Sequence, residues 1–240
     1  MKLGKTIAIC ASVVVIVNFG IAEGMHRHRP SSSVTSSHSE VTTPITIFNG
    51  GKYTGGVNEY NRPDGQGTAT YPDRSKYEGY WLDGDYRGTG TYTWADGAKY
   101  VGKWYAGKRD GYGTYTSADG VCKYEGNWAY DKKDGGGTMV YKGPQQYNSY
   151  KRTFGSYGDV YDGQWKNDKK EGWGTYTFAS GEEYYGEYKD GVREGKGKLT
   201  FADGGILEGS WASGRPVKAT YTSADGDKRD WTWNEFAGER

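Results

Sequence analysis

The chain has 240 residues, including 40 glycines, 23 tyrosines and 9 tryptophans, and its 31 lysines and arginines balance 30 aspartates and glutamates. This charge balance argues against a general nucleic-acid-binding protein, which carries a basic excess. All three histidines precede residue 39 and residues 48–240 contain one cysteine, so that region has no Ser–His–Asp or Cys–His catalytic set and no cysteine–histidine zinc site.

The first 22 residues have the pattern of a targeting segment. A short basic start precedes an apolar run over residues 7–17, and small residues follow at Gly20 and Ala22. This pattern predicts a secretory signal peptide that is cleaved after Ala22. A retained membrane anchor is the alternative, because the apolar stretch over 6–22 is at the lower limit for a spanning helix. Both predict an exported repeat region, either secreted or periplasmic, or held at a membrane outside the cytoplasm.

Residues 23–47 separate this segment from the rest of the chain. Ten of these 25 residues are serine or threonine, and the segment has too few apolar side chains to pack. We therefore predict a disordered linker over 23–47 and a repeat domain over 48–240.

Residues 48–240 repeat a Tyr-x-Gly-x-Trp pentad about every 23 residues. Each regular pentad is followed by a Gly-x-Gly element and, in most copies, by a Thr-Tyr-Thr type segment. The pentads lie at 77–81, 100–104, 124–128 and 161–165, with variants at 184–188 and 207–211 and an irregular first copy that starts at Tyr53.

This spacing predicts β-hairpins. Tyrosine, glycine and tryptophan two residues apart share one face of a strand, where the large rings lie over the glycines of the partner strand. Long helices are disfavoured by glycines every few residues, and a doubly wound α/β fold by only 11 Ile, Leu and Val over residues 48–240. One hairpin cannot bury its own aromatic face. The sequence therefore predicts an all-β, solenoid-like extended antiparallel sheet of six to seven stacked hairpins.

The units resemble MORN repeats, the "membrane occupation and recognition nexus" motif. The copies that start at Tyr77 and Tyr161 match that motif best, and the resemblance covers about residues 53–226. The copy at Leu207 lacks its Gly-x-Gly element, so residues 207–240 are predicted to form a C-terminal cap. The resemblance implies a non-catalytic scaffold that binds proteins or phospholipid membranes and needs no cofactor.

Basic residues recur where each hairpin turns. Stacked hairpins would align them along one edge, as a binding surface for an anionic membrane; the alternative is a solvated edge that prevents sheet-to-sheet aggregation. The candidate binding residues of this edge are Lys108, Arg109, Lys132, Lys133, Lys169, Lys170 and Arg193.

The repeat that starts at Tyr124 is about 14 residues longer than the others. Its surplus, residues 142–159, is rich in aromatic and basic side chains, and insertions in repeat arrays often carry the binding site. A loop without a function is the alternative. The candidate contact residues for a protein partner are Tyr147, Tyr150, Lys151, Arg152 and Phe154.

Two further functions remain open at this stage. If the tryptophans from Trp81 to Trp211 were exposed, the domain would suit a secreted glycan-binding module; if they are buried, they form the core. A carboxylate-based hydrolase is the less favoured alternative, because no Asp or Glu pair is singled out. We expect no catalytic residue, metal or cofactor. The two open ends of a long sheet also predict end-to-end self-association.

Overall fold

The computed structural model describes residues 39–141, 145–148, 153–156 and 158–232. The predicted targeting segment over 1–22 lies outside these residues. Within them, no helix is long and apolar enough to cross a bilayer.

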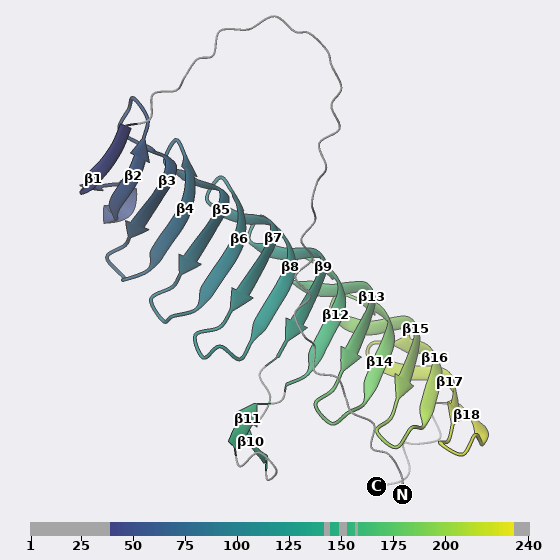
Figure 1. Ribbon diagram of the computed structural model, residues 1–240. Helices are drawn as coiled ribbons and strands as arrows, with labels where there is room; N and C mark the ends of the chain where they lie inside the picture. The colour runs from purple at the N-terminus through teal and green to yellow at the C-terminus, as the bar shows by residue number, and fades with distance from the viewer. Residues whose placement is uncertain (1–38, 142–144, 149–152, 157, 233–240) are drawn as a thin grey trace, which may run out of the picture. The chain divides into compact units, whose positions relative to one another are not determined.

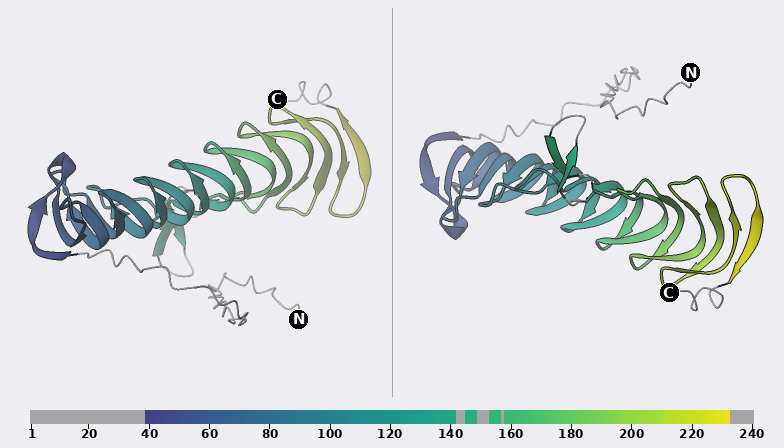
Figure 2. Two further views of the ribbon diagram at one scale, coloured as in Figure 1. Left: turned by 90° about the horizontal axis from the view of Figure 1, so that it is seen from above. Right: turned by 90° about the horizontal axis from the view of Figure 1, so that it is seen from below.

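The described chain is all-β, as the sequence predicts. Sixteen strands form one antiparallel sheet in chain order, and β10 and β11 form a separate two-stranded sheet (Figure 1). Figure 2 shows that the strands are bent and that successive hairpins are rotated along the sheet, as the right-handed twist of strands requires. The elements are β1 (Ser39–Thr46), η1 (Phe48–Gly50, a 3-10 turn), β2 (Lys52–Val57), β3 (Pro63–Thr70), β4 (Lys76–Leu82), β5 (Asp85–Thr93), β6 (Lys99–Tyr105), β7 (Lys108–Thr116), β8 (Lys123–Ala129), β9 (Lys132–Val140), β10 (Gln145–Asn148), β11 (Thr153–Ser156), β12 (Val160–Lys166), β13 (Lys169–Thr177), β14 (Glu183–Lys189), β15 (Val192–Thr200), β16 (Ile206–Ala212), β17 (Arg215–Thr222) and β18 (Lys228–Thr232).

Two kinds of turn connect the strands. At one edge, which we call the turn edge, two-residue turns join the strands of each hairpin from β4–β5 to β16–β17. Both turn residues have positive φ, for example 49° and 93° at Asp83 and Gly84. This is the geometry of a type I′ turn, whose twist matches that of the flanking strands. At the opposite edge, longer loops join successive hairpins. There the Asp96 carboxylate accepts the Ala98 N–H at 2.9 Å, and Gly97 has a φ of 94°.

A row of glycines crosses the sheet from strand to strand. Gly67 pairs with Gly79, Gly79 with Gly90, and the row runs unbroken from Gly55 to Gly209. A Cβ atom on Gly90 would overlap the ring of Tyr77. The glycines are therefore required because the tyrosine rings lie flat against the backbone in this row.

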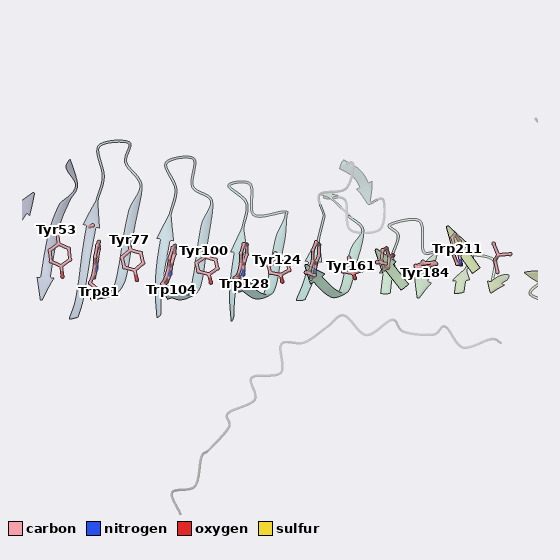
Figure 3. Packing of buried hydrophobic residues seen from close by; sticks show 14 of the residues in the cluster. Tyr53, Tyr77, Trp81, Tyr100, Trp104, Tyr124, Trp128, Tyr161, Tyr184 and Trp211 are labelled. Carbon is pink, nitrogen blue, oxygen red and sulfur yellow. The ribbon is translucent and has the colours of Figure 1, made fainter. Parts of the chain in front are cut away.

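The tyrosines and tryptophans of the pentads form the core. Their rings alternate along the sheet (Figure 3), each in edge-to-face contact with the next at centroid distances between 4.9 and 5.5 Å. Edge-to-face pairs are a favoured arrangement of aromatic rings. The rings are 0–6% exposed, so the aromatic stripe is not available for stacking on a glycan.

The polar atoms of these rings are also satisfied. Tyr100 Oη donates to the carbonyl of Lys103 at 3.0 Å, and Trp104 Nε1 donates to the carbonyl of Gly90 at 3.1 Å. The same two bonds recur in most hairpins. A core of Tyr and Trp is stable without many aliphatic residues because its polar groups keep hydrogen-bond partners when they leave water.

The sheet is continuous across the insertion. Strand β9 pairs with β12, Tyr141 N–H donates to the Asp159 carbonyl at 2.8 Å, and Tyr124 contacts Trp165 at 5.5 Å. The last distance equals that between Tyr77 and Trp104 in a regular repeat. The ring core is therefore continuous past the insertion, whose described strands β10 and β11 lie outside this sheet.

The structure differs from the predicted linker at its carboxyl end. Residues 39–46 form β1, which pairs with β2, and Val41 and Ile45 pack against the core. The sequence does not indicate this strand because its two partly buried apolar residues lie within a serine- and threonine-rich composition. A register shift between Val41 and Ile45, together with Pro44, breaks the regular hydrogen-bonding of this edge strand, and such features disfavour pairing with another chain. End-to-end association stays a prediction.

Alkaline pH is expected to unfold the protein through its core tyrosines. Burial raises the pKa of Tyr53 and of Tyr184 to about 12, above the ordinary value of 10. The folded state therefore favours the neutral phenol, and this stabilisation is complete below pH about 10 and lost as pH rises toward 12. Urea unfolding at increasing pH, with tyrosinate absorbance near 295 nm, measures it. Equal free energies of unfolding at pH about 8 and about 11.5 would contradict it.

Candidate interaction surfaces

The predicted row of basic residues is divided between the two faces of the sheet. After each turn, the second strand of the hairpin begins with two residues that we call the first and second positions. Because they are consecutive in a strand, their side chains point to opposite faces of the sheet. Lys108, Lys132 and Lys169 take the first position and are exposed. The second position lies opposite an aromatic ring of the preceding strand, on the face of the core, and is held by Arg109, Lys133, Lys170 and Arg193.

Arg109 is held by aromatic rings and by a carboxylate. Its guanidinium lies 4.2 Å from the ring centroid of Trp128, which is a favourable cation–π position. Its Nε donates to the Asp131 carboxylate at 3.1 Å, and its backbone N–H donates to the same oxygen at 3.0 Å. Because Asp131 is the second turn residue of the next hairpin, these bonds join neighbouring repeats.

Lys133 has the same surroundings one hairpin further on. Its Nζ lies 4.7 Å from the ring centroid of Trp165 and 4.0 Å from the Asp168 carboxylate, and its backbone N–H donates to Asp168 at 2.9 Å. Burial lowers the pKa of Lys133, and Asp168 partly offsets that shift. Both Arg109 and Lys133 thus belong to the packing between repeats, and their contact with a membrane stays a prediction.

The acidic residues beside the cations have a structural role. Glu171 Oε2 accepts the Asp190 N–H at 3.0 Å, and Glu194 Oε2 accepts the Ser213 N–H at 3.0 Å. In both cases the backbone N–H belongs to the first turn residue of the next hairpin. The turn provides no acceptor for this N–H within its own hairpin. Asp64, Asp110 and Asp134 make the corresponding contacts with Asp83, Tyr130 and Asn167 at 3.2–3.4 Å. These bonds fix the stagger of successive turns.

The opposite face carries exposed rings that the sequence reasoning did not single out. Tyr112, Trp173 and Tyr185 are about half exposed, and the rings of Trp173 and Tyr185 lie 5.2 Å apart. Each occupies a position one residue away from a glycine of the central row. Strand alternation alone would have placed them on the face opposite the core.

Two short strands of the insertion pair with each other. Strands β10 and β11 are antiparallel, with Tyr147 opposite Phe154. The other three candidates from the insertion, Tyr150, Lys151 and Arg152, lie outside the described residues. The contact proposed for this segment stays a prediction.

Two observations on the described residues concern the hydrolase alternative. No three His, Cys, Asp or Glu side chains in these ranges are grouped so that they could hold a metal ion. Hydrogen bonds lower the pKa of the carboxyl groups of Asp83, Glu125 and Asp190. A general acid for glycoside hydrolysis needs the opposite shift.

One open sheet of repeated hairpins, with a ring core and charged turns, defines a β-hairpin repeat protein. The model of the MORN repeat matches six segments of the chain: 59–76, 77–99, 100–122, 124–143, 161–183 and 184–206. The chain therefore belongs to the MORN-repeat family, as the pentads predict. No curated protein matches the chain. Repeats of this family are generally modules for interaction with proteins or membranes.

Proposed function

We propose that this protein is a non-catalytic scaffold that binds a protein partner along its turn edge. The observation that carries the proposal is that the pentad rings are buried in the core, whereas charged side chains recur in exposed positions at the turns. These charges are of both signs. Lys169 pairs with Asp190 at 2.8 Å and Lys166 with Asp134 at 3.2 Å. A mixed surface of this kind complements a protein better than a uniformly anionic membrane.

An anionic membrane is the second candidate. It is supported by the alignment of Lys108, Lys132 and Lys169, which are exposed at the same position of three hairpins. For both candidates we propose that the repeat domain acts outside the cytoplasm, secreted or tethered by residues 1–22. The basic start and apolar run of that segment support this location.

Reversing the charges of the turn edge is expected to abolish partner binding. The variant Lys108→Glu, Lys132→Glu, Lys169→Glu changes three exposed side chains, so it is expected to fold, since such substitutions usually change stability by about 0.5 kcal/mol or less. Cross-linking followed by mass spectrometry should detect a protein that the full chain binds and the variant does not. The matched control, Lys76→Glu, Lys99→Glu, Lys123→Glu, makes the same charge change toward the opposite edge and should keep the partner.

Co-sedimentation with vesicles decides between the two candidates. Binding of the wild type to anionic but not neutral vesicles, lost as salt rises and lost in the turn-edge variant, would favour the membrane. A partner that binds all three proteins equally would contradict a role for the turn edge.

A further inference from the structure

Lys170 and Arg193 differ from the two cations that precede them in the row. Lys170 Nζ lies 4.4 Å from the ring centroid of Tyr176, and the Arg193 guanidinium lies 5.0 Å from that of Trp211, so both point to the aromatic face. Within the described residues, however, neither forms an ion pair with a carboxylate. Arg109 and Lys133 both have one.

The difference is caused by the second turn residue of the next hairpin. Arg109 faces Asp131, and Lys133 faces Asp168. At the two equivalent positions that follow, Gly191 and Gly214 replace the aspartates. The backbone contact is kept, because the Gly191 N–H donates to the carbonyl of Lys170 and the Gly214 N–H to that of Arg193, both at 2.9 Å. Only the carboxylates are missing.

The aromatic stripe also changes at this place. Tyr188 takes the position that tryptophan holds in the four preceding pentads, and a tyrosine is smaller and has no indole N–H. A hollow of about 290 Å³ opens beside it, lined by Lys170, Tyr176, Phe178, Tyr188, Gly191, Val192, Arg193 and Gly214. Two cations, three rings and two glycines without side chains therefore surround one open space.

Among the described residues, no carboxylate lies within ion-pair distance of either cation in this hollow. Burial lowers the pKa of Lys170, and the neighbouring Arg193 lowers it further. Asp159 acts in the opposite direction, but its carboxylate accepts the Tyr176 hydroxyl at 2.6 Å and the Ala179 N–H at 2.9 Å. A partly buried pair of like charges with these rings is stabilised by an anion that enters from outside.

We propose that this hollow binds carboxylate side chains of an acidic segment in a protein partner, which take the places that Asp131 and Asp168 fill in the preceding hairpins. The proposal rests on the proposed scaffold function and assigns it a site and a partner chemistry. The two cations belong to hairpins that are two strand spacings apart, about 9–10 Å. Acidic residues about three positions apart in an extended segment span that distance.

Restoring the missing carboxylates tests the proposal. The variant Gly191→Asp, Gly214→Asp places a carboxylate beside each cation, and a Cβ atom at either position meets no heavy atom within 4 Å. The φ values of 93° and 83° are near the 70° and 69° of Asp131 and Asp168, a region that Asp and Asn tolerate. The matched control, Gly191→Asn, Gly214→Asn, places an uncharged side chain of similar size at the same positive φ values. Thermal melting shows that each variant is folded.

The probes are an octaglutamate peptide, an octaglutamine peptide and anionic vesicles, each titrated against the full chain by calorimetry at low salt. We expect the wild type and the Asn variant to bind octaglutamate equally, the Asp variant to bind it at least tenfold more weakly, and none to bind octaglutamine. The variant Lys170→Gln, Arg193→Gln should show the same loss without a change at either glycine.

Three results would overturn the proposal: no binding of octaglutamate to the wild type, equal binding to the Asp and Asn variants, or a dependence on the two glycines that is seen with vesicles only. The proposed function is tested separately by the turn-edge variant. If the wild type does not bind octaglutamate but still cross-links to its partner, the hollow is not the binding site, and the proposed scaffold function is unaffected.

Discussion

Replacing Trp128 by alanine is expected to lower the free energy of unfolding by about 3–5 kcal/mol, the usual range for a buried tryptophan. Its ring is 6% exposed and lies edge-to-face against Tyr100 at 5.4 Å and Tyr124 at 5.1 Å. The substitution also removes the donor to the Gly113 carbonyl and the ring beneath Arg109. Urea denaturation followed by tyrosine fluorescence and circular dichroism measures the change.

Trp173→Ala is the matched control for this prediction. That ring is 47% exposed on the opposite face, where its aromatic neighbour is Tyr185. We expect a loss of at most about 1 kcal/mol, since the contact is a single aromatic pair with little burial. Equal losses for the two substitutions would show that the stripe is not the core.

Gly137→Ala is expected to destabilise the sheet by about 1–3 kcal/mol or more, although it adds one methyl group. A Cβ atom there would lie 2.6 Å from Cζ of Tyr124. That ring has no room to move, because it is 1% exposed, donates from Oη to the Asn127 carbonyl at 3.0 Å and contacts Trp128. The methyl group therefore forces either the ring or the backbone of β9 out of position.

The adjacent glycine is the control. Gly136 lies on the same strand, and a Cβ atom added to it would point to the opposite face of the sheet. There it would contact only the Gln164 side chain, at 3.6 Å. Gly136→Ala is expected to be neutral or to stabilise by up to about 1 kcal/mol, because it reduces the entropy of the unfolded chain. Chemical denaturation of both variants measures their free energies of unfolding. A Gly136→Ala variant as unstable as Gly137→Ala would show that the glycine row has no special packing role.

The hairpin, its period and its buried face follow directly from the order of the amino acids. The ring at Tyr77, the space at Gly79 and the ring at Trp81 are two residues apart, and strand geometry alone puts them on one face. The surplus over 142–159 was also visible, because a lengthened period is a property of the sequence. The ring and glycine positions are encoded within one repeat of about 23 residues, and the surplus is found by comparing that repeat with the others.

The roles of the charged residues, in contrast, depend on contacts between hairpins. Lys132 and Lys133 look equivalent in the sequence, yet one is exposed and the other lies over Trp165. The partner of Arg109 is Asp131, in the next hairpin, and the same register leaves Lys170 opposite Gly191 with no carboxylate. These contacts join residues about one repeat apart, so they depend on the stagger between hairpins. That stagger is set by the fit of rings to glycines and by the acidic side chains that bind the next turn, neither of which a single repeat specifies.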